Sequence, residues 1–232
     1  MSKLTLVATP IGNLGDLSAR TAKELADADL WVVEDTRVSA KLASHLDLKK
    51  SMRVLNDHST EFQVQRIVAD IKNGMNACLL TDGGSPAISD PGAILTDMCH
   101  RQEIEVDSIP GPSAVTNALA LSGFFAQRFV FLGFLARKSG QIKSDLSPFS
   151  DSALTLVLFE SPHRLEALLK SAFEVLGERR YAICREMTKM HQQVYRDFLP
   201  NVPSESSVPK KGEVTLVIEG RRRTTVSLES SG

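Results

Sequence analysis

The first half of the chain alternates short apolar runs with more polar segments of helical character. The apolar runs, rich in branched residues, predict buried strands at residues 4–8, 30–33, 77–80 and 104–109. The segments between them predict helices at residues 18–28, 39–46, 60–73 and 90–101. Strands that alternate with helices are typical of a parallel sheet with helices on both faces.

Local signals mark the ends of some of these helices. Thr21 and Glu24 stand at the spacing of a capping box near the start of the first helix. In the helix at 60–73 the apolar residues favour one side, and Gly74 ends the helix. The residues expected on that side are Phe62, Ile67, Val68 and Ile71.

The second half of the chain contains several strands with little helix between the last of them. Strands are expected at residues 128–134, 154–159, 181–185, 193–198 and 214–218. Ser113 is expected to cap a helix at 114–121, and residues 135–150 predict a loop or short helix. Ser161 and Pro162 are expected to begin another helix, which Gly177 ends. This pattern favours a mixed sheet with antiparallel members.

The run Pro110-Gly111-Pro112 interrupts the chain near its midpoint, because it continues neither a strand nor a helix. We therefore expect two α/β domains. The first, at 1–112, has a mainly parallel sheet with helices on both faces, and the second, at 113–220, has a mixed sheet. Residues 221–232 are polar and are expected to form a flexible tail.

Composition narrows the possible functions. The chain has 232 residues, of which 42% are hydrophobic, and a formal net charge of −1, which argues against bulk nucleic-acid binding. Contact with RNA would need a local basic patch or a prefolded target. Cys78, Cys99 and Cys184 lie far apart, so we expect neither a zinc site nor a disulfide framework. Cys78 and Cys184 lie inside apolar runs and are expected to be core thiols. No apolar run approaches a membrane span and no signal peptide is evident, so a cytoplasmic enzyme is expected.

Ligands of open α/β sheets bind beyond the carboxyl ends of the strands, so the loops there are the candidate sites. Residues 81–92 read TDGGSPAISDPG, and this density of Gly and Pro directly after a buried strand indicates a ligand loop. Residues 9–16 contain Gly12 and Gly15 without a dinucleotide fingerprint, so they form either a ligand loop or a plain connection. Residues 110–113 could supply backbone amides at a helix start, or serve as a hinge.

Charged residues follow several of the strands. Residues 34–37 read EDTR, which could bind a ribose, form a catalytic cluster or simply cap a helix. His58 beside Asp57 could be a general base or a solvated loop residue. Residues 160–164 and 185–189 put opposite charges at two further strand ends, which suits either one polar site or surface ion pairs. No Ser-His-Asp order and no Walker loop is present.

Taken together and in order, these strings resemble the tetrapyrrole-methylase superfamily, and within it the branch that 2'-O-methylates small-subunit ribosomal RNA (the cytidine-2'-O-methyltransferase I type). The matching strings are ATPIGNL at 8–14, EDTR at 34–37, TDGGSPAISDPG at 81–92, PGPSA at 110–114, FLGFL at 131–135, ESPHRL at 160–165, REMTK at 185–189 and KGE at 211–213. Any one of these strings is weak evidence for the family, but the whole set in this order is very specific for it.

The resemblance implies that S-adenosylmethionine binds in a cleft between two α/β domains of a homodimer. It implies methyl transfer to the 2'-hydroxyl of a cytidine ribose in 16S rRNA of the small ribosomal subunit. The cofactor-binding residues that it implies are Ile11, Gly12, Gly84, Ser85, Pro86, Ile88, Ser113, Ala114, Phe159, Gly212, Glu213 and Val214. The catalytic residues that it implies are Glu34, Asp35, Arg37, Glu160 and Arg164, with Glu186 also facing the substrate.

The sequence departs from the family pattern at His58-Ser59-Thr60-Glu61, where members often carry a His-Asn-Glu run, and in a less basic loop at 137–143. Both departures concern RNA more than the cofactor. Two alternatives remain open: a methyltransferase acting on a small tetrapyrrole precursor, and a non-catalytic cofactor-binding factor of ribosome assembly. A Rossmann dehydrogenase is disfavoured because the glycine fingerprint is missing.

Overall fold

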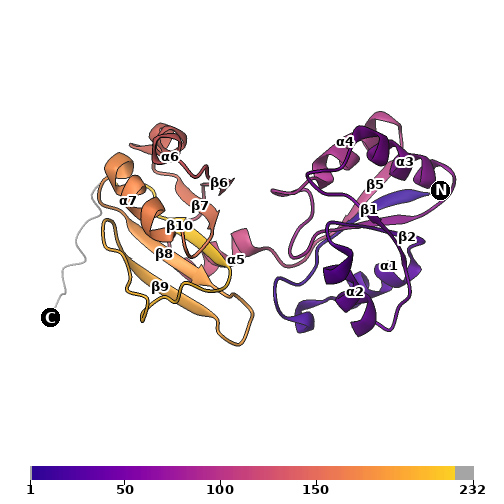
Figure 1. The fold of residues 1–232 in the computed structure, drawn as a ribbon, viewed down its shortest axis with the longest axis horizontal. Coiled ribbons are helices and arrows are strands. Elements are labelled where there is room, and N and C mark those ends of the chain that lie inside the picture. The colour runs from indigo at the N-terminus through magenta and orange to yellow at the C-terminus, as the bar shows by residue number, and fades with distance from the viewer. Residues whose placement is uncertain (1, 223–232) are drawn as a thin grey trace. The chain divides into compact units, whose positions relative to one another are not determined.

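A computed structural model describes residues 2–222 (Figure 1). The chain forms two compact units, unit 1 ending at Ser113 and unit 2 beginning at Ala114. Of the tail expected at 221–232, Arg221 and Arg222 are described, and the rest lies outside the described residues. Each unit has its own sheet and its own hydrophobic core.

Unit 1 contains a five-stranded sheet in the order β3-β2-β4-β1-β5, and all of its neighbouring strands pair in parallel. The strands are β1 (Lys3–Val7), β2 (Leu30–Val33), β3 (Ser51–Val54), β4 (Ala77–Leu80) and β5 (Glu105–Ile109). The expected parallel sheet is confirmed. Strand β3 was not expected, because this edge strand is short and mostly exposed and so lacks a buried apolar pattern.

Helices cover both faces of this sheet (Figure 1). The elements are η1 (Leu14–Asp16), α1 (Ala19–Asp27), α2 (Thr36–His45), α3 (Glu61–Lys72) and α4 (Gly92–Arg101). One core cluster joins α1 and α2 to strand residues such as Trp31 and Leu80, and another joins α3 and α4 to Val32 and Leu79. Successive strand residues therefore face opposite helix layers, which is why the strands read as continuous apolar runs.

Three expectations about the ends and faces of these helices are wrong. The cap of α1 is Ser18, whose hydroxyl accepts the Thr21 N–H at 3.0 Å, so Thr21 does not begin a capping box. Helix α2 begins at Thr36 because the Asp35 carboxylate caps it, three residues before the expected start at 39. Phe62 is 66% exposed, and Val64 takes the expected place in the core, since the buried stripe is set by contact with the sheet.

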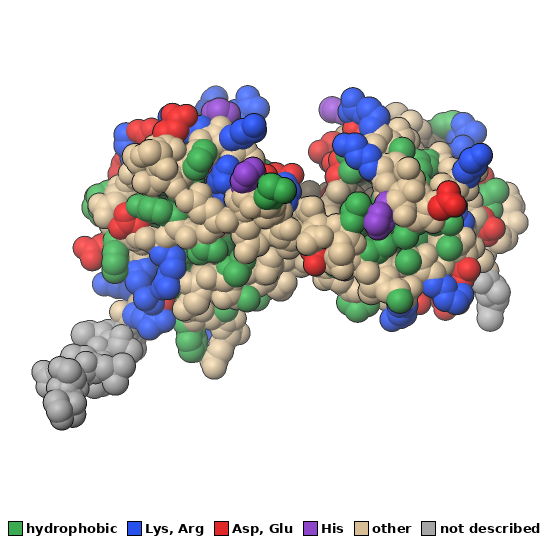
Figure 2. All heavy atoms as spheres, turned by 90° about the horizontal axis from the view of Figure 1, so that it is seen from below, with side chains coloured by type: hydrophobic (Ala, Val, Ile, Leu, Met, Phe, Trp, Pro, Cys, Tyr) green, Lys and Arg blue, Asp and Glu red, His purple; other side chains and the backbone are tan. Residues whose placement is uncertain are grey.

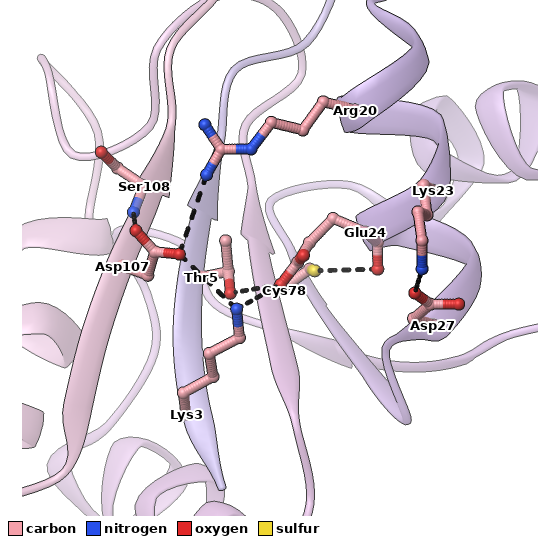
Figure 3. A network of polar contacts seen from close by, with 9 residues as sticks. All are labelled: Lys3, Thr5, Arg20, Lys23, Glu24, Asp27, Cys78, Asp107 and Ser108. Atoms are coloured by element: carbon pink, nitrogen blue, oxygen red, sulfur yellow. Dashed lines mark hydrogen bonds and ion pairs between the residues drawn. The ribbon is translucent and has the colours of Figure 1, made fainter.

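A polar network lies between α1 and the sheet (Figure 3). Glu24 accepts hydrogen bonds from the Thr5 hydroxyl and the Lys3 ammonium, each at 2.8 Å, and Lys3 also lies 3.5 Å from Asp107. The Lys3 ammonium lowers the pKa of the Glu24 carboxyl below its ordinary value. The network therefore connects β1, α1 and β5, and it stabilises the folded state most when Glu24 is ionised.

Replacing Glu24 by Gln is expected to lower the free energy of unfolding at pH 7 by about 1 kcal/mol. Because the folded pKa of Glu24 is depressed, this contribution is present above the pKa of an unfolded Glu and is lost as pH falls through the folded value. Urea unfolding at pH 7 measures the loss of stability, and urea unfolding in acid measures whether the difference between variant and wild type disappears. Asp27→Asn, which removes the exposed Lys23–Asp27 pair, is the control; an equal or larger effect there would contradict the prediction.

Unit 2 contains a mixed sheet in the order β6-β7-β10-β8-β9, in which β6 and β7 are parallel and the other pairs antiparallel. The expected mixed sheet is thereby confirmed. The strands are β6 (Phe129–Phe134), β7 (Thr155–Glu160), β8 (Arg180–Arg185), β9 (Gln193–Phe198) and β10 (Val214–Ile218). The helical elements are α5 (Ala114–Ser122), α6 (Ser139–Leu146), η2 (Ser147–Phe149) and α7 (Leu165–Leu176).

The start of α7 differs from the expectation. Ser161 and Pro162 lie in a turn, and the helix begins only at Leu165. The turn is closed by Arg164 N–H, which donates to Ser161 O at 2.9 Å, and the Ser161 N–H is taken by the Glu160 carboxylate at 2.6 Å. Ser161 therefore caps no helix. Gly177 ends α7, as expected.

Cys78, Cys99 and Cys184 are free and buried, which confirms the core thiols expected at Cys78 and Cys184. Burial raises the pKa of the Cys78 thiol to about 12, so it stays protonated at neutral pH. Within residues 2–222 no cluster of His, Cys, Asp and Glu is arranged to hold a metal ion. The helices of the described chain are also too short or too polar to cross a membrane.

Candidate functional site

The loops that follow β1, β4 and β5 meet at the carboxyl edge of the unit 1 sheet. Thr9 and Gly84 pair across two of these loops through N–H to O bonds of 2.9 and 3.0 Å. The Thr9 hydroxyl also donates to Thr81 O at 3.1 Å, and the Ser85 hydroxyl lies 3.5 Å from Pro112 O. Segments far apart in sequence thus form one structured edge, where ligands of parallel sheets bind.

Gly84 is required at the centre of this edge. Its φ of +97° lies in the left-handed region, where a side chain is strained. A Cβ on it would stand 3.4 Å from Ile11 Cγ2 and 3.8 Å from Pro112 O, so the three loops approach one another here. Pro86 in the same loop is buried. The Gly-Pro pattern therefore serves close packing between loops and leaves backbone free to contact a ligand.

The same loop carries further backbone strain. Ala87 and Ser89 have φ values of +64° and +60°, each costing about 1–3 kcal/mol in a residue with a side chain. Between them Ile88 projects an apolar side chain that is 52% exposed. Asp90 is tied to Gly92 N–H through Oδ1 at 2.8 Å, and its Oδ2 is buried without a hydrogen-bond partner. Strain held in place beside an exposed apolar residue is typical of a ligand loop.

Four charged residues follow β2 and β4 at this edge. Asp35 binds Arg37 Nη2 at 2.5 Å, and the guanidinium and the Arg37 backbone N–H lower the pKa of Asp35 to about 2. Glu34 accepts from the Thr81 hydroxyl at 3.3 Å. Burial, and then the charge of Asp82, raise the pKa of Glu34. The two neighbouring carboxyls thus differ in basicity. Asp35, which caps α2, has a lowered pKa and is the weaker base, whereas Glu34 has a raised pKa and is the stronger base.

In unit 2, Glu160 and Arg164 follow β7. Glu160 is only 3% exposed, and this burial raises the pKa of its carboxyl. Arg164 Nη2 lies 3.2 Å from Glu160 Oε2, but the geometry makes no hydrogen bond. The same Nη2 donates to Leu135 O at 2.8 Å and Ala136 O at 3.0 Å. Both side chains therefore hold neighbouring backbone in place, which is a positioning role. Phe159 lies on the opposite face of β7, against Phe131 and Phe134.

Glu186 and Gly212 interlock at the same edge of unit 2. Glu186 Oε1 accepts from Glu213 N–H and from the Lys189 ammonium, each at 2.9 Å. Gly212 has a φ of +91°, and a Cβ there would stand 2.6 Å from Glu186 Cγ and Cδ. The Glu186 carboxylate thus shapes the loop at 212–214, and the expectation that Glu186 faces the substrate stays a prediction.

The expected site residues thus fall into one group in each unit. The unit 1 group contains Ile11, Gly12, Glu34, Asp35, Arg37, Gly84, Ser85, Pro86, Ile88 and Ser113. The unit 2 group contains Ala114, Phe159, Glu160, Arg164, Gly212, Glu213 and Val214. Their roles as cofactor-binding and catalytic residues stay predictions.

Sequence reasoning missed Asp82, Thr81 and Lys189 as members of these groups. Thr81 and Asp82 act on Glu34 because β4 pairs with β2, although 47 residues separate Thr81 from Glu34. No local pattern in the sequence reveals that strand order. The available signal was that Thr81 and Asp82 directly follow a buried strand, and this signal identified only a loop.

Comparison with known proteins identifies the family. Residues 3–203 match the model of the tetrapyrrole (corrin/porphyrin) methylases. The "Ribosomal RNA small subunit methyltransferase I" of Thermotoga maritima is 39% identical over 222 residues, covering 95% of this chain and 100% of its own. The protein of the same name from Mycobacterium tuberculosis is 41% identical over 221 residues, covering 94% and 78%.

Solved structures share the fold. The methyltransferase CobJ is similar with a TM-score of 0.71 at 14% identity, covering 97% of this chain and 98% of its own. A uroporphyrin-III C-methyltransferase from Thermus thermophilus, complexed with S-adenyl homocysteine, has a TM-score of 0.65 at 17% identity, covering 94% and 97%. The expected fold is confirmed, and the chain belongs to the tetrapyrrole methylase family and, within it, to the ribosomal RNA small subunit methyltransferase I group.

Proposed function

We propose that this chain transfers a methyl group from S-adenosylmethionine to the 2'-hydroxyl of a cytidine ribose in 16S rRNA of the small ribosomal subunit. The observation that carries the proposal is the alignment with the Thermotoga maritima relative over 95% of this chain and the whole of that protein. The family resemblance supports the ribose position, a homodimer and a cytoplasmic location as parts of the same proposal.

The loops of unit 1 fit such a cofactor. Gly12 and Gly83 expose backbone unshielded by side chains, and the exposed Ile88 side chain offers an apolar surface for an aromatic base. Unit 2 would contribute Phe159 and the loop from Gly212 to Val214, whose shape Glu186 maintains. The cofactor supplies a methyl group on a positively charged sulfur. The residues of the chain hold it and bring the acceptor hydroxyl into line.

A ribose hydroxyl is a poor nucleophile, and a nearby base accelerates its attack by removing the proton. We propose Glu34 as that base. Its carboxyl is partly exposed and has a raised pKa. Asp35 is bound to Arg37, and Glu160 is buried. We propose that Arg37, whose side chain is 88% exposed, binds a phosphate of the substrate RNA.

Incubation with labelled S-adenosylmethionine and small subunits from a strain lacking this methylation tests the proposal. We expect label at one cytidine ribose of 16S rRNA and none in small tetrapyrrole precursors. Label in a precursor instead would assign the chain to the small-molecule branch. Cofactor binding without incorporation into subunits would indicate a non-catalytic assembly factor.

A further inference from the structure

Four exposed cations, Arg137, Lys138, Lys210 and Lys211, lie in two loops of unit 2; together they are called the cationic rim. The first pair follows the end of β6 and the second precedes the start of β10. Because β6 runs parallel to β7 and β10 runs antiparallel to it, the end of β6 and the start of β10 lie at the same edge of the sheet. The topology therefore gathers both pairs at one edge.

The cations of the rim are not neutralised by direct ion pairs, although, after the hydrogen bond from Lys170, the charge of Lys210 helps to lower the pKa of Glu166. Over residues 2–222 none of the four forms an ion pair, whereas other cations of unit 2 are neutralised: Lys143 by Glu174, Lys170 by Glu166, and Arg180 by Glu219. Figure 2 shows that positively charged side chains gather in groups on the surface of this unit. A chain with net charge −1 thus keeps uncompensated positive charge at a particular edge.

Half-buried and buried arginines hold the backbone of the rim in place. Arg164 donates to Ala136 O at 3.0 Å, directly before Arg137. Arg185, which is 8% exposed, donates from Nε to Lys211 O at 2.7 Å. The rim therefore has a fixed backbone that carries four exposed positive charges, which suits a ligand with repeated negative charges.

We propose that the cationic rim binds backbone phosphates of the ribosomal RNA strand beside the ribose to be methylated. This inference rests on the proposed function. The rim shares its edge with Glu160 and with the loop at 212–214, which the proposed function places at the cofactor, so phosphates held there would flank the reacting nucleotide. The contacts are to phosphate, so they add affinity and position without reading sequence.

The test compares Lys210→Ala/Lys211→Ala and Arg137→Ala/Lys138→Ala with the wild type, using small ribosomal subunits as substrate. Each pair of substitutions is expected to raise the KM for subunits about tenfold at 0.15 M salt and to leave kcat at saturation unchanged. The slope of log KM against log salt should become shallower by about 1–2. The cofactor Kd should stay at the wild-type value.

Lys23→Ala/Lys143→Ala is the matched control, because it removes the same charge from lysines that already have acidic partners, Asp27 and Glu174. Equal KM values for the rim variants and this control would overturn the proposal. That outcome differs from failure of the proposed function, in which the wild type itself would transfer no label to subunits. Filter binding of 16S rRNA provides a second readout: unchanged affinity and unchanged salt slope in both rim variants would also refute it.

Discussion

Glu34→Gln is expected to lower kcat by about a hundredfold or more, because general-base assistance contributes about 10²–10⁴ to rate. The carboxyl stands after β2 with the Thr81 hydroxyl 3.3 Å away, and its pKa is raised by burial and by the neighbouring Asp82. Gln retains the shape and the acceptor oxygen but cannot take a proton. Single-turnover methylation of small subunits at saturating cofactor measures the loss.

The pH dependence of the methylation rate follows from the raised pKa of Glu34. The base acts only when deprotonated, so the wild-type rate should fall as pH drops through the pKa of Glu34, which burial and Asp82 raise above its ordinary value. A carboxyl whose folded pKa is raised destabilises the folded state once it ionises, so Glu34→Gln should be at least as stable as the wild type at pH 7. A slow variant that is also less stable would contradict this.

Two further variants locate the base. Asp35→Asn retains a good helix cap, and we expect a smaller loss because the pKa of Asp35 is already about 2. Glu61→Gln changes an exposed carboxylate in the first turn of α3 and serves as the control. If Asp35→Asn is the slower enzyme, the base is Asp35. If neither Glu34→Gln nor Asp35→Asn lowers kcat by about tenfold, the base lies elsewhere.

Gly212→Ala is expected to weaken S-adenosylmethionine binding by roughly a hundredfold, equivalent to about 3 kcal/mol. The residue has a φ of +91°, and an added Cβ would stand 2.6 Å from Glu186 Cγ and Cδ. Backbone strain and steric overlap cost about 1–3 kcal/mol each. The loop would relieve both by moving away from Glu186, and the residues proposed to hold the cofactor would move with it. Calorimetric titration measures the change.

A double-mutant cycle identifies the contact. Glu186→Ala alone should also weaken binding, since Glu213 N–H and Lys189 lose their acceptor. In Glu186→Ala/Gly212→Ala the atoms that the new Cβ meets are gone, so the combined loss should be smaller than the sum. Gly177→Ala is the control, with a φ of +68° and no atom within 4 Å of its Cβ. Additive losses would refute the contact between Gly212 and Glu186. A Gly177→Ala variant that binds the cofactor as poorly as Gly212→Ala would also refute it.

Several elements were predicted from local pattern alone. The ranges of β2, β4, β9 and β10 were expected as observed, because consecutive or alternating apolar residues identify a strand whatever its partners. The starts of the helices were harder to predict from the sequence. Near α1 both Ser18 and Thr21 could act as the cap, and Ser18 does so. Helix α7 has no side-chain cap, because a turn after β7 delays its start to Leu165.

By itself the sequence determined the two α/β halves, the loop at 81–92 as a candidate ligand site and the family, since each rests on local pattern or ordered motifs. The tertiary structure decided which charged groups meet. Strand order brings Asp82 to Glu34, sets Glu186 against Gly212 and gathers the cationic rim. The physical reason is that strand pairing joins residues far apart in sequence, and the pKa, the close contact and the shared edge all arise only from that pairing.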